Sequence, residues 1–142
     1  MAAPQEPVLS REELIAFLDE VFPQMGGEAS VEAVGPMWAR LRLHVGERHL
    51  RPGRTVSGPA MFMLADVAFY AAVLTMIGRE PLAVTTGLTI NFLRKPPATD
   101  IIGEARILKL GRRLATGDVT LISEGRSEPV AHAVTSYAIP DR

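Results

Sequence analysis

One segment of this chain is almost entirely apolar: residues 57–78, SGPAMFMLADVAFYAAVLTMIG, carry a single charge, on Asp66. Pro59 suits the first turn of a helix, and Gly78 is a residue that ends one. A carboxylate in an apolar helix is costly to desolvate unless it is paired or put to use. Asp66 is therefore a candidate reactive group; the alternative is a carboxylate that faces solvent or bonds to a neighbouring strand.

The apolar segment is long enough to raise the question of a membrane span. Asp66, near its middle, would be costly in lipid, and the segment has no flanking clusters of Lys and Arg or aromatic belts. The strands that follow offer it a core to pack in. The sequence therefore predicts a buried central helix and no membrane partner.

Composition narrows the function classes. A chain of 142 residues fits a single domain, 1–142, and 22% charged with 47% apolar residues is ordinary for a folded soluble protein. The net charge of −1 predicts no nucleic-acid partner. The absence of cysteine excludes disulfides, thiolate metal sites and a cysteine nucleophile, and no secretory signal is evident at the N-terminus. We expect a cytoplasmic protein.

Hydrophobic periodicity predicts the other elements. Residues 1–28 contain a short amphipathic helix that begins with a capping box at Ser10 and Glu13, followed by a turn. From Val31 the period changes to two, which indicates strands. Four more strands are predicted at 81–93, 100–110, 112–123 and 128–139. A helix this uniformly apolar must be covered on several sides, so we predict an α+β fold in which a curved antiparallel sheet wraps around it.

Three segments carry a family resemblance. The first is Ser57-Gly58-Pro59, whose glycine lies eight residues before Asp66. The other two are predicted strands that follow the helix, AVTTGLTINFLRKP (83–96) and GEARILKLGRRLATGDV (103–119). Together they resemble the PaaI-like, phenylacetate-pathway type of hotdog-fold acyl-CoA thioesterases, whose helix signature is H-G-G, six residues and Asp. The resemblance spans about residues 30–140. It implies a hotdog fold and thioester hydrolysis without metal or cofactor, coenzyme A being part of the substrate.

The resemblance also implies roles for four residues. The backbone N–H of Gly58 corresponds to the oxyanion donor, and Asp66 to the carboxylate that acts as nucleophile or as general base on water. Thr85 matches a hydroxyl that orients the carboxylate or its water, and is otherwise a residue favoured in strands. Ser57 replaces the family histidine; it donates a hydrogen bond in the histidine's place or caps the helix.

Helix geometry adds a constraint on assembly. Eight residues separate Gly58 from Asp66, which is about 12 Å of helical rise. One helix cannot easily bring both groups to one carbonyl, whereas a symmetric dimer with antiparallel central helices can. The family has such shared sites, so we expect a homodimer, extended to a dimer of dimers.

Basic residues near strand ends and in the loop before the helix are candidates for binding the phosphates of coenzyme A. They are Arg51, Arg54, Arg94, Lys95, Arg112 and Arg113. The alternative is that they are solvated surface charges.

Other catalytic classes are disfavoured. The chain has no G-x-S-x-G elbow, its histidines lack metal-ligand spacing, and Ala71 stands where hotdog hydratases carry a histidine five residues after the aspartate. Pro59 replaces the second signature glycine, and Arg51 replaces a polar residue of the family. Two functions remain: hydrolysis of aryl- or medium-chain acyl-CoA, and non-catalytic binding of acyl-CoA or fatty-acyl groups.

Overall fold

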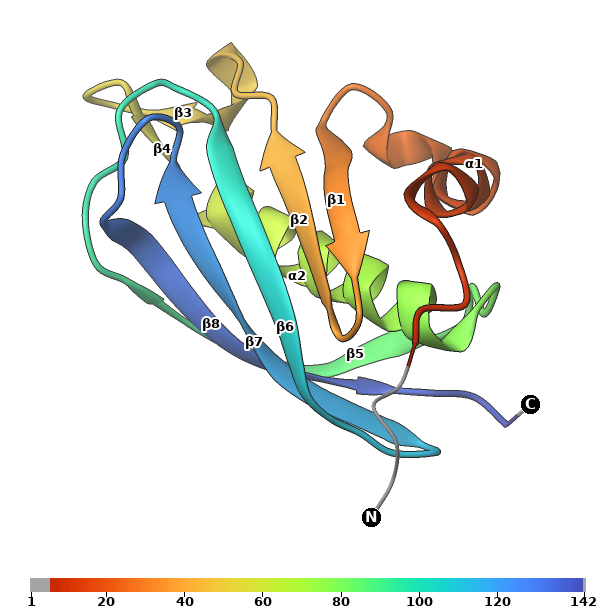
Figure 1. The fold of residues 1–142 in the computed structure, drawn as a ribbon. Coiled ribbons are helices and arrows are strands. Elements are labelled where there is room, and N and C mark those ends of the chain that lie inside the picture. Colours follow the sequence, from red (N-terminus) through yellow and green to blue (C-terminus); the bar gives the residue numbers. More distant parts are fainter. Residues whose placement is uncertain (1–5, 142) are drawn as a thin grey trace.

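The computed structural model describes residues 6–141. In chain order the elements are α1 (Arg11–Val21), η1 (Pro23–Met25), β1 (Ala29–Gly35), β2 (Trp38–Leu43), η2 (Glu47–His49), β3 (Leu50–Arg51), β4 (Thr55–Val56), α2 (Gly58–Ile77), β5 (Val84–Phe92), β6 (Ile101–Leu110), β7 (Leu114–Ser123) and β8 (Pro129–Ala138). Six strands form one antiparallel sheet in the order β1-β2-β6-β7-β8-β5. The sheet curves around α2, and α1 lies beside β1 (Figure 1).

Helix α2 is the predicted central helix. Ser57 is its N-cap, and Gly78 follows its last turn with φ +97°, a conformation that glycine adopts readily. By length and composition the helix would suffice to cross a membrane, but 78% of its apolar window is buried inside the protein. It is the core helix of the fold, as the sequence predicted.

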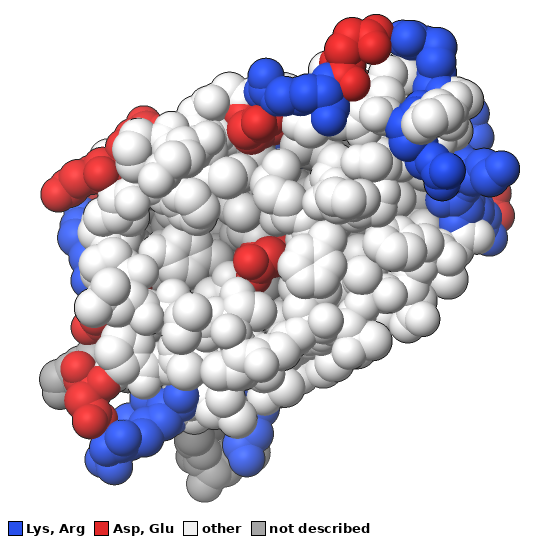
Figure 2. Space-filling model, turned by 180° about the vertical axis from the view of Figure 1, so that it is seen from behind, with Lys and Arg blue, Asp and Glu red and all other residues white. Residues whose placement is uncertain are grey.

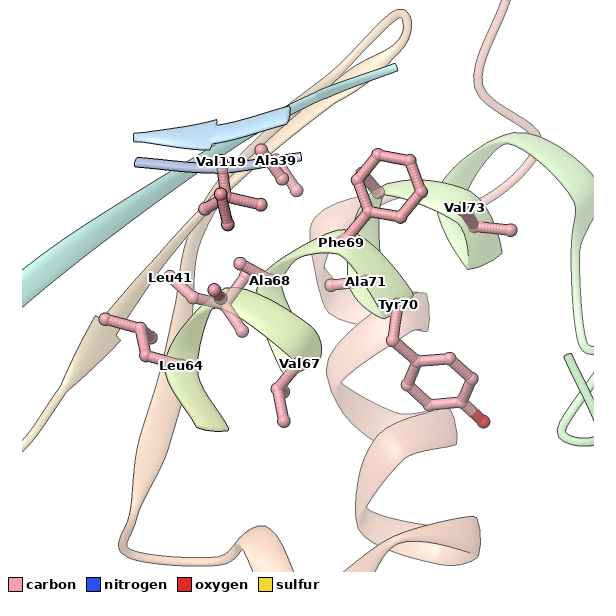
Figure 3. Close-up of a cluster of buried hydrophobic side chains, with 14 of the residues drawn as sticks. Ala39, Leu41, Leu64, Val67, Ala68, Phe69, Tyr70, Ala71, Val73 and Val119 are labelled. Carbon is pink, nitrogen blue, oxygen red and sulfur yellow. The ribbon is translucent and has the colours of Figure 1, made fainter. Parts of the chain in front are cut away.

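The two sides of α2 have different surroundings. Ala68 and Phe69 point toward Ala39 and Val119 of the sheet, whereas Tyr70 points away from them (Figure 3). The sheet approaches so closely that a Cβ at Gly117 of β7 would lie 2.5 Å from the Phe69 ring. The candidate site lies where α2 meets β5 and β8, at the edge of the sheet.

The remaining sequence predictions hold in outline. The capping box forms at the start of α1, where Ser10 Oγ accepts from the Glu13 N–H at 3.1 Å and Glu13 Oε1 from the Ser10 N–H at 2.9 Å. The alternation in β2 buries Ala39, Leu41 and Leu43.

Two stretches differ from the prediction. The polar loop before α2 contains the short hairpin β3–β4, because Pro52-Gly53 makes a turn closed by the Arg54 N–H to the Arg51 carbonyl at 3.0 Å. The strand predicted from residue 81 begins only at Val84, after a turn. Proline at position 81 has no N–H for a ladder, and its carbonyl accepts from the Tyr70 hydroxyl instead.

Candidate active site

The Asp66 carboxylate is half-buried on α2, and two hydroxyl groups hold the same one of its oxygens. Thr85 Oγ1 donates to Asp66 Oδ1 at 2.6 Å, and the Tyr137 hydroxyl donates to it at 2.7 Å. The Tyr137 hydroxyl also lies 3.1 Å from the backbone carbonyl oxygen of Asp66. Within residues 6–141, Oδ2 has no hydrogen-bond partner. The carboxylate is thus oriented through Oδ1, and Oδ2 is the oxygen available to a reactant.

The two hydroxyl donors come from neighbouring strands. Thr85 and Tyr137 are paired across β5 and β8, and the register shifts between Thr85 and Gly87, immediately after this pair. A bulge bends a strand and redirects a side chain. Here it lies next to the position from which Thr85 reaches Asp66. Thr85 is a residue predicted from the sequence, whereas Tyr137 is not.

Burial, together with the neighbouring Asp66 carboxylate, raises the pKa of Tyr137 far above its ordinary value. The phenol therefore remains protonated and serves as a donor at any physiological pH. Tyr70 stacks on it, with ring centroids 6.0 Å apart and planes at 27°. The Tyr70 hydroxyl donates to the Pro81 carbonyl at 3.0 Å, and burial raises the pKa of this tyrosine as well.

A cavity of about 420 Å³ opens beside the carboxylate. Asp66, Thr85 and Tyr137 supply its polar wall, and most of the rest is apolar or aromatic, including Phe22 and Met63. An apolar cavity with a few convergent polar groups is the usual form of a small-molecule site. The cavity has room for an apolar group whose reactive end meets Asp66.

The start of α2 presents one free N–H group. Ser57 Oγ accepts from the Ala60 N–H at 3.3 Å, and the Ser57 carbonyl accepts from the Met61 N–H at 3.1 Å. Pro59 has no N–H. Of these first four positions, only Gly58 has an N–H without a partner in the described part of the chain. Because the positive end of the helix dipole lies here, this N–H is suited to a developing negative charge.

A buried histidine holds this helix start in place. The His49 carbonyl accepts from the Ser57 N–H at 2.8 Å, and the His49 Nδ1 accepts from the Gly46 N–H at 2.9 Å. Since Nδ1 is the acceptor, Nε2 is assigned the proton and donates to Glu28 Oε2 at 2.8 Å. Hydrogen bonds from Arg48 and His49 hold the pKa of Glu28 below its usual value. This role of His49 was not predicted from the sequence.

The basic candidates divide between two places. Arg51 and Arg54 lie in the β3–β4 hairpin, and β4 meets the chain after Arg94-Lys95 through the Val56 N–H to the Pro96 carbonyl at 3.1 Å. These four residues thus approach the start of α2, where a Cβ at Gly58 would lie 3.3 Å from the Phe92 ring. Arg54 pairs with Glu47 at 3.1 Å and Arg94 with Glu128 at 3.1 Å, whereas Lys95 forms no ion pair with any residue of the described chain.

Arg112 and Arg113 lie in the β6–β7 turn, at the opposite end of the sheet. The Arg113 carbonyl accepts from the Ile139 N–H, next to the position where Ala138 pairs with Val84 at the beginning of β5. Arg113 forms an ion pair with Asp141 at 2.8 Å. Within a single chain the fold therefore does not bring these two arginines to the other four basic residues.

The molecule has a broad uncharged face on the α2 and β5 side. Figure 2 shows this face with basic groups gathered toward its ends and one acidic group near its middle. Strand β5 pairs only with β8 in the described sheet, so its other edge is free. Large exposed apolar side chains lie on β5, next to its ends and on α2: Phe62, Leu82, Val84, Phe92 and Leu93. An apolar face of this kind is typical of an interface.

A curved antiparallel sheet wrapped around one long apolar helix defines the hotdog fold, here with a carboxylate on the helix that is held by hydroxyls from β5 and β8. The family model described as the thioesterase superfamily matches residues 53–130, and the chain belongs to this superfamily. It is accordingly an enzyme of the thioester-hydrolase class.

Individual relatives agree with this assignment. A crystal structure of a candidate thioesterase from a Silicibacter species is 54% identical, covers 96% of each chain and has a TM-score of 0.90. The phenylacetic acid degradation protein PaaI from Thermus thermophilus, solved as a mutant, is 28% identical over 83% of this chain and 99% of that one, with a TM-score of 0.73. A candidate esterase from Saccharolobus solfataricus is 29% identical over 94% of this chain and 87% of its own. The resemblance found in the sequence is thereby confirmed.

Proposed function

We propose that the protein hydrolyses acyl-CoA thioesters with Asp66 as the reacting carboxylate. The observation that carries this proposal is the asymmetry of the carboxylate: two hydroxyls hold Oδ1, and Oδ2 is free beside an apolar cavity. A carboxylate held in this way is preorganised for attack or for proton abstraction. Ser57 caps the helix, since its hydroxyl accepts from the Ala60 N–H, and the same hydroxyl can still donate its proton in the place of the family histidine.

Two routes are open to the carboxylate. In the first, Oδ2 attacks the thioester carbonyl carbon, the C–S bond breaks, and CoA leaves as a thiolate; water then hydrolyses the mixed anhydride and restores the carboxylate. In the second, Oδ2 takes a proton from a water that attacks the carbonyl carbon; the C–S bond then breaks, and CoA leaves as a thiolate that takes up the proton. In both routes the Gly58 N–H stabilises the negative charge on the carbonyl oxygen. Neither route requires a metal or a further cofactor, and we place the activity in the cytoplasm.

The proposed site is shared between two subunits. Gly58 and Asp66 of one chain are about 12 Å apart along α2, too far to act on the same carbonyl. The free edge of β5 and the apolar face beside α2 offer a surface for a second copy. In a two-fold dimer with antiparallel α2 helices, Gly58 of one subunit faces Asp66 of the other, and two equivalent sites form. A dimer of such dimers is compatible with this arrangement.

The same dimer explains the divided basic residues. Arg94 and Lys95 follow the end of β5, whereas Arg112 and Arg113 lie near its beginning. Antiparallel pairing of two β5 strands would bring the two arginines of one subunit toward the Arg94–Lys95 end of the other. We propose that these residues, with Arg51 and Arg54 of the hairpin, bind the phosphates of coenzyme A.

The test is release of free thiol from a panel of aryl-, short- and medium-chain acyl-CoA substrates. We expect Asp66→Asn to lower kcat by about 10²–10⁴-fold while the fold is retained, because Thr85 and Tyr137 can still donate to the amide oxygen. Asp118→Asn is the matched control, since this half-buried aspartate on β7 is held by Arg106 and His132 outside the site. Equal background release from wild type and Asp66→Asn would reject the proposal, and tight acyl-CoA binding with it would indicate a non-catalytic binding protein.

A further inference from the structure

A second cavity adjoins the one that contains Asp66. It has a volume of about 260 Å³ and lies between α1 and β1. Phe22, Met25 and Val67 line both cavities. Val67 follows Asp66 directly on α2, so the second cavity begins one residue from the reacting carboxylate.

The second cavity, here called the α1 cavity, is elongated. Helix α1 lines it with a stripe that runs from Arg11 through Ile15 and Leu18 to Phe22. Eleven positions along a helix correspond to about 16 Å. Apolar side chains from β1 and β2 form the opposite wall, and Gly26-Gly27 adds no side chains to the space. The shape is that of a narrow channel that is mostly apolar, with Arg11, Asp19 and Ser30 as its polar lining.

Phe22, Met25 and Val67 separate the two cavities; Val67 is buried, and the other two side chains are partly exposed. Phe22 is half-buried and meets Tyr70 edge-on, with ring centroids 6.2 Å apart and planes at 75°. Met25 is half-buried too, and methionine is the apolar side chain that adapts most readily to its surroundings. Rotation of these two side chains would join the cavities. Protein interiors are otherwise densely packed, so adjoining apolar spaces beside a reacting group indicate room for a ligand.

We infer that the α1 cavity binds the tail of the acyl group, and that the preferred substrate is a thioester of a linear, medium-chain acid. This inference rests on the proposed function. With the carbonyl at Asp66, the first carbons pass Val67 and Phe22, and the tail extends along α1 toward Leu18. An extended alkyl chain advances about 1.25 Å per carbon, given C–C bonds of about 1.5 Å. About ten carbons therefore suffice to enter most of the channel, whereas a single aromatic ring would occupy only the first cavity.

The test compares butanoyl-, octanoyl- and dodecanoyl-CoA in wild type and in Leu18→Trp, which places a large side chain in the α1 cavity. Each buried methylene contributes about fourfold to affinity, so we expect kcat/KM in wild type to rise with chain length. In Leu18→Trp the ratio of dodecanoyl to butanoyl kcat/KM should fall at least about tenfold. Ala16→Trp is the matched control, because Ala16 is exposed on the same helix and does not line the cavity. Its ratio should equal that of wild type.

Binding of the same three thioesters to Asp66→Asn, measured by calorimetry, gives the chain-length preference without turnover. If no thioester is hydrolysed by wild type, the proposed function is rejected, whatever the binding shows. If hydrolysis occurs but chain length has no effect, or if Leu18→Trp and Ala16→Trp share the wild-type ratio, the α1 cavity does not hold the acyl tail. A preference for phenylacetyl-CoA over octanoyl-CoA would also overturn the inference.

Discussion

Tyr137 and Asp66 lie 71 positions apart in the chain, yet the tyrosine hydroxyl contacts both the side-chain Oδ1 and the backbone carbonyl of the aspartate. The hydroxyl therefore fixes the carboxylate relative to its own helix as well as to β8. In the described part of the chain, Tyr70 is the one titratable side chain whose ring stacks on that of Tyr137. The hydrogen bond from Tyr137 to Asp66 is the contact that a substitution of Tyr137 by phenylalanine removes.

Replacing Tyr137 by phenylalanine should impair positioning of the carboxylate without removing it. We expect kcat to fall by about tenfold, which corresponds to about 1.4 kcal/mol. The variant leaves Thr85 as the remaining hydroxyl donor to the carboxylate. Tyr70→Phe is the control, since its hydroxyl donates to Pro81 and not to Asp66. An equal loss of kcat in both variants would contradict the assigned role.

Replacing Gly58 by proline should remove the oxyanion donor. Ser57 already has the extended backbone that a following proline requires, with φ −73° and ψ 155°. Loss of one such donor lowers kcat by about 10²–10³-fold. Gly58→Ala adds a Cβ against Phe92 but keeps the N–H, so the difference between the two variants isolates the donor. Similar rates for both would show that the N–H plays no part.

Mixing the inactive variants tests the shared site. When Gly58→Pro and Asp66→Asn subunits are unfolded together and reassembled, half of the dimers are mixed, and each mixed dimer contains one intact site. Activity should return to about a quarter of the wild-type value. If Gly58 and Asp66 of the same chain acted together, the mixed dimers would recover no activity.

The free energy of unfolding should depend on pH through Glu28, which precedes β1 and bonds to Arg48 and His49 in the loop before α2. Because Arg48 and His49 lower the pKa of this carboxyl in the folded protein, its contribution is complete above the unfolded value of about 4.3 and is lost as the pH falls through the folded value. We expect Glu28→Gln to lower the Tm at pH 7, and the difference between the two proteins to shrink as the pH falls through the lowered folded pKa of Glu28. Calorimetric unfolding between pH 3 and 8 measures this. A Tm difference that stays constant over the range would exclude the mechanism.

The free edge of β5 should govern assembly. Val84 is 57% exposed at the start of this strand, and a lysine there would bury a charge in a paired interface. We expect Val84→Lys to be monomeric in light scattering and to lose thioesterase activity. Leu108→Lys, at a similarly exposed leucine on β6, should keep the wild-type assembly. A monomeric wild-type protein with full activity would refute the dimer.

Much of the fold follows from local pattern. The charge-free stretch around Asp66, with proline at its start and glycine at its end, predicted α2, and the alternation in β2 predicted which residues are buried. Asp66 was singled out as the one charge in that stretch and then matched a family position, whereas Thr85 was singled out by the family match. These features depend on residues close in sequence, where spacing alone constrains the structure.

The rest of the site depends on contacts between distant segments. Nothing around Tyr137 distinguishes it from a buried strand residue, because its role arises from the register of β8 against β5. The hydrogen bond from His49 to Glu28 likewise joins two loops. The sequence placed Arg94 and Arg113 near strand ends but not at opposite ends of the sheet, since strand order is a property of the whole fold.

Because Thr85 lies on the edge strand β5, the orientation of the Asp66 carboxylate depends on the chain that pairs with this edge. Thr85 donates to Asp66 from the first pairs of the β5–β8 ladder, and the outer side of β5 has no strand beside it in the described chain. Edge strands open more readily than central ones. A second chain bound along β5 would therefore act as an activator, tightening the hold on Asp66, and dilution would switch the enzyme off before it unfolds.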